Sequence, residues 1–153
     1  AGLAHANNFG GHLAWHEALC HLALGDDAEA IALYDARVAI HLGPDYRDVV
    51  NGVTLVHRLA ARGHDVRDRA ARLAAIAIEH IGDHGSTFAD LHYMLALADV
   101  DPERARRFAA SMRACPTLAA SPTAGMPIAR ATIATWLDAP PCSRMRPRIL
   151  ERG

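Results

Sequence analysis

The chain has 153 residues, of which 51% are hydrophobic but only 5% aromatic, and its 16 basic residues, all arginine, nearly balance 17 acidic ones. A core built mainly from Ala and Leu favours close-packed helices over a β-sandwich, whose strands need Val, Ile, Thr and aromatic side chains. The net charge of −1 gives no reason to expect nucleic acid or an anionic membrane as a partner, and we expect neither.

The cysteines indicate a reducing compartment. Cys20, Cys115 and Cys142 are odd in number and widely spaced, so they match neither a disulfide framework nor a CxxC zinc pattern. No apolar run approaches the roughly 20 residues that span a bilayer. We therefore expect a cytoplasmic protein. Because the chain starts at Ala1 close to its first strong helix, we also expect it to be a piece of a longer protein.

Glycines, prolines and capping residues divide residues 9–115 into about six predicted helices. The first three are expected over 9–24 (or 11–24), from the Asp26-Asp27 cap to just before Gly43, and over 49–62 after a cap at Asp45 or Asp48. The next three are expected over 66–81, over 88–98 after a cap at Ser86 or Thr87, and from Pro102 to about 115 after a cap at Asp101. A loop at 117–126 and a seventh helix at 127–137 follow. Residues 138–153 lack an amphipathic period, which predicts an irregular or disordered tail.

The predicted helices form pairs with a period of about 35 to 40 residues, which is typical of an α-solenoid. Second helices begin alike and place a small residue in corresponding positions at Ala30, Ala70 and Ala105. In the first pair, Gly25, Ala30 and Tyr34 have the spacing of the tetratricopeptide repeat. The sequence thus predicts an all-α fold over 1–137, an α-α superhelix of about three stacked antiparallel helix pairs plus a partial one.

Three segments resemble the family of tetratricopeptide repeat protein 38: HLAWHEALCHLALGDDAEAIALYD, RDVVNGVTLVHRLAARGHDV and DHGSTFADLHYMLAL. The matching positions are His12, Trp15 and His16; Asp48, Val49, Arg58, Leu59 and Gly63; and Phe88, Asp90, His92 and Met94. Val56 replaces the first Leu of the second motif, and Met94 comes one place early in the third. The resemblance covers residues from about 7 to 130. It implies an α-superhelix and a C-terminal portion of a longer family member, and it implies no particular activity.

Ten histidines are several times the usual share, and two of them suggest a site. At 100° per residue, His12, Trp15 and His16 share one side of the first helix with Leu19, Cys20 and Ala23, and Cys20 is expected to be a small buried residue. The i,i+4 spacing lets two imidazoles reach one metal ion. His16-Glu17 does not begin an HExxH motif, because the next His is residue 21.

One hypothesis places a pocket where the first helix meets the fifth. There, His12, Trp15 and His16 would meet His92, and Asp90 or Asp83 would orient one of the imidazoles, with His12, His16 and His92 as ligands of a divalent metal or as general acids and bases. The other hypothesis is structural: the imidazoles bond to carbonyls and acids between stacked repeats, with Trp15 in the core. The sequence is compatible with both hypotheses.

The leading functional interpretation is a repeat protein whose concave face, built from first helices, binds a protein, a peptide or a ligand. The alternative is a metal-dependent or histidine-based enzyme with its site at His12, His16 and His92. No cofactor is expected beyond such a metal. Arg67, Arg69 and Arg72 are expected on a solvated face, and Arg58 is expected to pair with Asp48 or Asp35 at a repeat junction.

Overall fold

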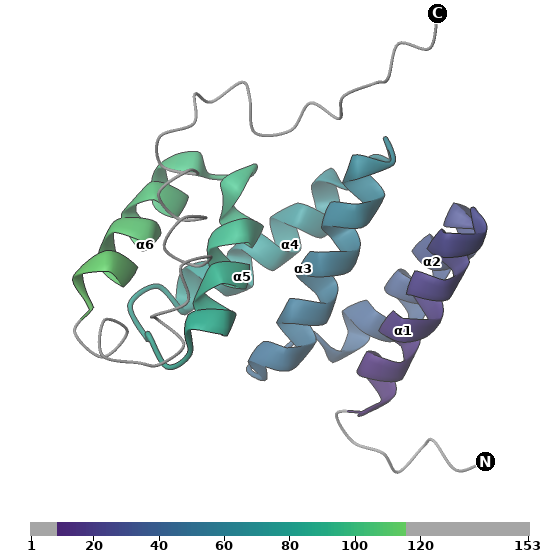
Figure 1. The fold of residues 1–153 in the computed structure, drawn as a ribbon, viewed down its shortest axis with the longest axis horizontal. Helices are drawn as coiled ribbons and strands as arrows, with labels where there is room; N and C mark the ends of the chain where they lie inside the picture. Colours follow the sequence, from purple (N-terminus) through teal and green to yellow (C-terminus); the bar gives the residue numbers. More distant parts are fainter. Residues whose placement is uncertain (1–8, 116–153) are drawn as a thin grey trace, which may run out of the picture.

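The computed structural model describes residues 9–115, which contain helices and no strand (Figure 1). The helices are α1 (Phe9–Leu24), α2 (Asp27–Leu33), the π-helical turn η2 (Tyr34–Val38), the 3₁₀ turn η3 (Ala39–His41), α3 (Tyr46–Ala61), α4 (Arg67–Glu79), α5 (Thr87–Ala98) and α6 (Pro102–Ala114). The predicted all-α class is confirmed. The predicted seventh helix, the tail and the domain boundary at 137 lie outside the described residues.

Local capping explains where half of the described α-helices begin and where two of them end. The carboxylates of Asp26, Asp45 and Asp101 accept hydrogen bonds from backbone N–H groups in the first turns of α2, α3 and α6. Gly25 and Gly63 follow α1 and α3 with φ values of 79° and 91°, a left-handed conformation that glycine adopts without strain. These signals are visible in the sequence, and the predicted helices are therefore found within a few residues of their expected limits.

Helices α1, α3 and α5 pack side by side in that order, and each contacts the even-numbered helix that follows it in the chain (Figure 1). Helix α3 packs against α1 and α5, while α2, α4 and α6 pack against α1, α3 and α5 respectively. Each even-numbered element also reaches the next odd-numbered helix, since η2 contacts α3 and α4 contacts α5. Every described helix pair is thus joined to the next one through both of its members.

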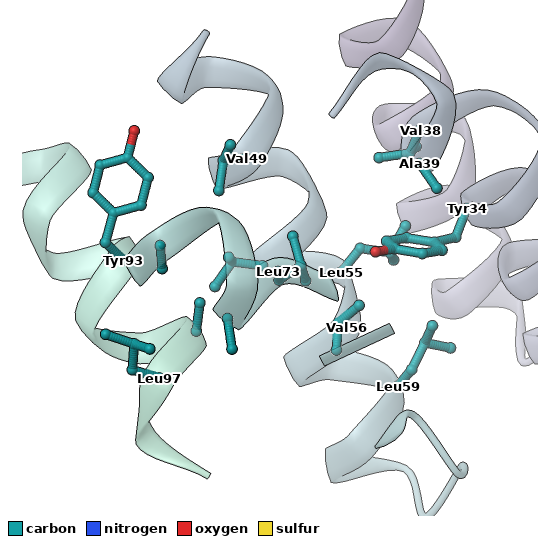
Figure 2. Close-up of a cluster of buried hydrophobic side chains, with 14 of the residues drawn as sticks. Tyr34, Val38, Ala39, Val49, Leu55, Val56, Leu59, Leu73, Tyr93 and Leu97 are labelled. Carbon is teal, nitrogen blue, oxygen red and sulfur yellow. The ribbon is translucent and has the colours of Figure 1, made fainter. Parts of the chain in front are cut away.

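The core consists of large aliphatic side chains separated by alanines. Leu55, Leu59, Leu73 and Leu97 are fully buried, and Figure 2 shows them in one cluster with Tyr34 and Val38 of η2. Alanines at 0% exposure lie between them and let helix axes approach closely: Ala14, Ala18, Ala30, Ala77, Ala105 and Ala109. The small residue predicted in second helices is buried at Ala30 and Ala105. At Ala70 it is only half-buried.

The buried face of α1 differs from the predicted one. Its buried residues are Gly11, Ala14, Ala18 and Leu22, with Trp15 and Leu19 packed partly against the core. His16, Cys20 and Ala23 are exposed, so the prediction that Cys20 is buried is wrong. The face is turned by roughly 100°, about one residue. Because α1 is apolar nearly all round, its small residues decide which side packs closest.

Polar contacts repeat between consecutive helix pairs at similar sequence separations. Trp15 Nε1 donates to Thr54 Oγ1 at 3.0 Å, 39 residues away, and His57 Nε2 donates to the Leu95 carbonyl at 3.2 Å, 38 residues away. In the second helices, Arg69 pairs with Asp35, 34 residues away. Arg58, which was expected to pair with Asp48 or Asp35, instead donates to the Thr54 carbonyl in its own helix.

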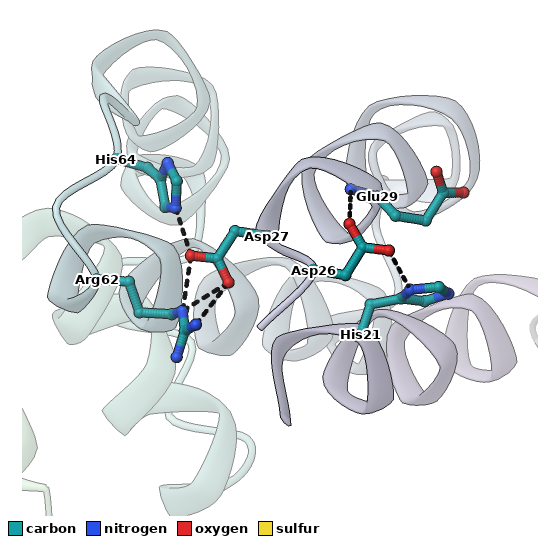
Figure 3. Close-up of polar contacts among 6 residues, drawn as sticks. All are labelled: His21, Asp26, Asp27, Glu29, Arg62 and His64. Atoms are coloured by element: carbon teal, nitrogen blue, oxygen red, sulfur yellow. Dashed lines mark hydrogen bonds and ion pairs between the residues drawn. The ribbon is translucent and has the colours of Figure 1, made fainter. Parts of the chain in front are cut away.

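The connection after α3 is bound to the start of α2. Arg62 and His64 both donate to the carboxylate of Asp27, at 2.8 and 2.7 Å (Figure 3). In the same view, Asp26 caps α2 and accepts from His21 of α1. Asp27 therefore links the first helix pair to the second.

Candidate functional site

His12 and His16 lie together on α1, as the i,i+4 spacing predicts. Their Nε2 atoms are 3.1 Å apart, and the ring planes make an angle of 85°. His12 is half-buried because α3 covers its other side, and its Nδ1 donates to Asn51 Oδ1 at 3.3 Å. His16 is exposed. The two side chains therefore present adjacent ring nitrogens at the surface of the α1–α3 junction.

The indole of Trp15 packs against both imidazoles of this pair. It stacks on the His12 ring, with a centroid distance of 5.4 Å and an interplanar angle of 22°, and contacts His16 edge-on. Its Nε1–H bonds to Thr54 of α3. Trp15 is thus partly core, as the structural hypothesis states, and also the platform on which the two imidazoles rest.

His92 does not complete a metal site with His12 and His16. Its Nδ1 donates to the Phe88 carbonyl at 2.7 Å in its own helix, and the Phe88 ring lies against it. Burial lowers the pKa of His92, so the neutral imidazole is favoured there. Within residues 9–115, no three His, Cys, Asp or Glu side chains are grouped so that they could hold a metal ion. The expected three-histidine cluster is therefore wrong for the described part of the chain.

Asp90 has a different partner from the predicted ones. Its carboxylate is only 1% exposed and accepts from His84 Nδ1 at 3.2 Å, while Ser111 Oγ lies 3.0 Å from His84 Nε2. Asp83 pairs with His80 at 2.8 Å. Burial raises the pKa of Asp90, although the hydrogen bond from His84 opposes that rise. Neither carboxylate orients His12, His16 or His92.

The Ser111–His84–Asp90 chain has the residue order of a nucleophile, a base and an orienting acid, but the hydroxyl has two competing acceptors. Ser111 Oγ also lies 3.0 Å from the Phe108 carbonyl in its own helix, to which it donates. A single hydroxyl proton cannot serve both acceptors fully. Since His84 also stacks on Phe108, the chain joins α5 and α6 to the loop before α5. We interpret it as a structural network.

A cavity of about 310 Å³ lies where the second half of α3, the first half of α4 and the end of α5 meet. Its lining is mostly apolar, with one imidazole, one guanidinium and one carboxylate: Val53, Val56, His57, Ala60, Val66, Arg67, Ala70, Leu73, Ala96, Asp99 and Val100. Its volume lies at the lower end of the range for small-ligand pockets, roughly 300–1,000 Å³. The cavity reaches the buried side chains Val53 and Leu73.

Sequence reasoning missed this cavity because no single helix signals it. Its walls come from three helices, and the half-buried alanines Ala60 and Ala70 make room where larger residues would fill the gap. The available signal was weak: the small-residue position of the second helices holds Ala70, which is less covered than Ala30 and Ala105.

Comparison with models of known protein families gives no match, and comparison with solved structures gives none either. Among the described residues, no helix has the length and apolar character needed to cross a membrane.

Proposed function

We propose that this chain is a tetratricopeptide-like repeat portion that binds a partner peptide through an apolar side chain. Support for the repeat arrangement comes from the polar contacts between consecutive helix pairs, which recur at separations of 34 to 39 residues. The three segments that resemble the family of tetratricopeptide repeat protein 38 point the same way, and we propose that family as its relatives. Such arrays serve as binding surfaces.

The observation that carries the binding proposal is the apolar cavity between α3, α4 and α5. An opening of about 310 Å³ with mostly apolar walls falls within the size range of small-ligand pockets, so it can take a ligand group. It lies between α3 and α4, which form one helix pair, and α5, which begins the next pair. We therefore place the peptide anchor there rather than on the first helices alone.

The chemistry of the walls selects the anchor. Val53, Val56 and Leu73 give aliphatic contact, which favours a Leu, Ile or Phe side chain. The imidazole of His57 already donates to the Leu95 carbonyl, and Arg67 is paired with Asp65, so these polar groups are occupied. A hydroxylated anchor would therefore lose its hydration without gaining a partner from His57 or Arg67.

The test uses two pentapeptides, acetyl-Ala-Ala-Phe-Ala-Ala-amide and its Ser-centred counterpart, titrated into the full ¹⁵N-labelled chain. With the Phe peptide, we expect saturable amide shifts at Val56, Ala70 and Ala96. We expect none at these positions with the Ser peptide. Ala70→Leu fills the cavity and should abolish the shifts, whereas Ala75→Leu, on the exposed side of the same helix, should preserve them.

Equal shifts with both peptides, or retention of the shifts in Ala70→Leu, would contradict the proposal. The alternative of an enzyme at His12, His16 and His92 has less support, because the three imidazoles do not form one group in the described residues.

A further inference from the structure

The His12–His16 pair has a feature that neither packing nor peptide binding requires. Two imidazoles one helical turn apart aim their Nε2 atoms at each other, 3.1 Å apart, on the exposed side of α1. Neither nitrogen bonds to a carbonyl, in contrast to Nδ1 of His92 and Nε2 of His57. The pair is therefore available to a ligand from solvent.

The neighbours of His12 fix its tautomer. An amide oxygen can only accept, so the Nδ1–H of His12 donates to Asn51 Oδ1 and Nε2 carries the lone pair. Asn51 is itself only 5% exposed on α3, so its side chain is held in place. Stacking on Trp15 holds the ring plane. This combination, a ligating nitrogen with the other ring nitrogen hydrogen-bonded, is the usual outer-shell arrangement of a metal-binding His.

The nitrogen separation suits one metal ion. Two imidazole nitrogens at about 2.0–2.1 Å from a tetrahedral metal lie roughly 3.3–3.4 Å apart, close to the observed 3.1 Å. Metal binding would replace the hydrogen bond between the two Nε2 atoms, and the exposed His16 ring would turn so that both lone pairs meet at the ion. Its Nε2 proton would move to Nδ1, where solvent can accept a hydrogen bond. The buried carboxylate of Asp48 is close enough to interact electrostatically with His12, and it favours a cation there.

We propose that His12 and His16 form a two-imidazole surface site for a divalent transition-metal ion, with Asn51 as positioning residue. Imidazole suits Cu²⁺, Ni²⁺ and Zn²⁺, and Cu²⁺ binds most tightly of these to nitrogen ligands. Water fills the remaining coordination positions, since the described residues supply no third ligand. This inference does not depend on the proposed peptide binding, because the cavity lies among other residues of α3, α4 and α5.

The test uses the full chain without an affinity tag, carrying Trp136→Phe so that Trp15 is the only indole. Titration with CuCl₂ should quench Trp15 fluorescence in a saturable phase with 1:1 stoichiometry, because the indole contacts both ligands. ZnCl₂ titration by calorimetry should give the same stoichiometry. His16→Gln should remove this phase, and Asn51→Ala should weaken it about tenfold through loss of the outer-shell hydrogen bond.

His21→Gln is the matched control, since it is on the same helix but its Nδ1 pairs with Asp26. It should leave the titration unchanged. His16 is exposed, so its variant is expected to stay folded, and far-UV circular dichroism checks this. Lack of a saturable 1:1 phase would overturn the proposal, as would equal losses in the His16 and His21 variants. Loss in Cys20→Ser with none in His16→Gln would also overturn it.

Discussion

At the scale of single residues, Tyr34 is the least satisfied side chain of the core. Its ring is 1% exposed and lies beneath Arg69, whose guanidinium carbon is 5.9 Å from the ring centroid. Burial raises its pKa to about 12, so the phenol stays protonated at ordinary pH. Among the described residues, the buried hydroxyl has no hydrogen-bond partner. An unpaired buried polar group is destabilising.

Tyr34→Phe is therefore expected to raise the free energy of unfolding by about 1 kcal/mol, because it removes the unpaired hydroxyl and keeps the ring. Urea denaturation followed by circular dichroism measures this. Tyr46→Phe is the matched control, since Tyr46 is 40% exposed and should show little change. A less stable Tyr34→Phe variant would mean that the hydroxyl has a partner.

Asp48 is expected to make stability depend on pH in the opposite direction from a paired carboxylate. Its side chain is buried, and burial is the main reason that its pKa lies above the ordinary 3.8, with the Asp45 charge adding to the effect. A carboxyl group whose pKa is higher in the folded state stabilises the fold at pH values below its unfolded-state pKa. This stabilisation is lost as the pH rises through the folded-state pKa. Asp48→Asn should therefore be more stable than the parent at pH 7 and similar to it at pH 3. Thermal unfolding at both pH values tests this.

At the scale of helices and their connections, Asp27 is expected to make stability depend on pH in the opposite direction from Asp48. Hydrogen bonds from Arg62, and then from His64, lower its pKa from 3.8 to about 2. A carboxyl group whose pKa is lower in the folded state stabilises the fold at pH values above its unfolded-state pKa. For Asp27, this stabilisation is lost as the pH falls from about 3.8 to about 2. We expect Asp27→Asn to lower the urea midpoint at pH 7 and the difference to shrink towards pH 2. Asp68→Asn, on an exposed position of α4, should show no such trend.

Helix α3 is packed closely on two sides at Gly52. A Cβ atom there would lie 3.0 Å from Cδ2 of Leu42 and 3.0 Å from Cδ2 of Leu73. Gly52→Val is expected to reduce the free energy of unfolding by about 1–3 kcal/mol, as overpacking does. Gly85→Val serves as control in the same denaturation experiment, because no heavy atom lies within 4 Å of its added Cβ. Equal stability of the two variants would show that both leucines move aside.

Helix limits and the His12–His16 pair could be predicted from the sequence, whereas the buried face of α1 and the partners of Asp90 and His92 could not. Asp26, Asp45 and Asp101 act through neighbouring backbone groups, so short-range patterns suffice to find them. The face of α1 depends on which small residues approach α2 and α3, and an apolar helix leaves that undecided. The partner of Asp90 depends on loop geometry, because His84, at a φ of 47°, turns towards Asp90 and Ser111.

At the scale of the whole molecule, α3 and α5 occupy the middle of the described helices. Helix α3 contacts α1, α4 and α5, and α5 contacts α3, α4 and α6. In a linear array of packed units, local opening is expected to begin away from the centre. We expect amides of Val53 and Leu97 to exchange with deuterium more slowly than those of α1 and α2. Uniform protection across α1 to α6 would instead indicate one cooperative unit.

The π-helical turn η2 shows how a helix of this chain accommodates an extra residue. A π turn holds one residue more than an α turn, and here Tyr34 and Val38 stay buried on either side of the extra residue. The extra residue is accommodated within the helix, and Trp15 still donates to Thr54 and Arg69 to Asp35. A helix of this chain can thus hold one residue more without losing its contacts to the next helix pair. Equivalent positions in successive helix pairs are therefore better matched by the contacts they make than by counting residues, since a π turn shifts the count by one.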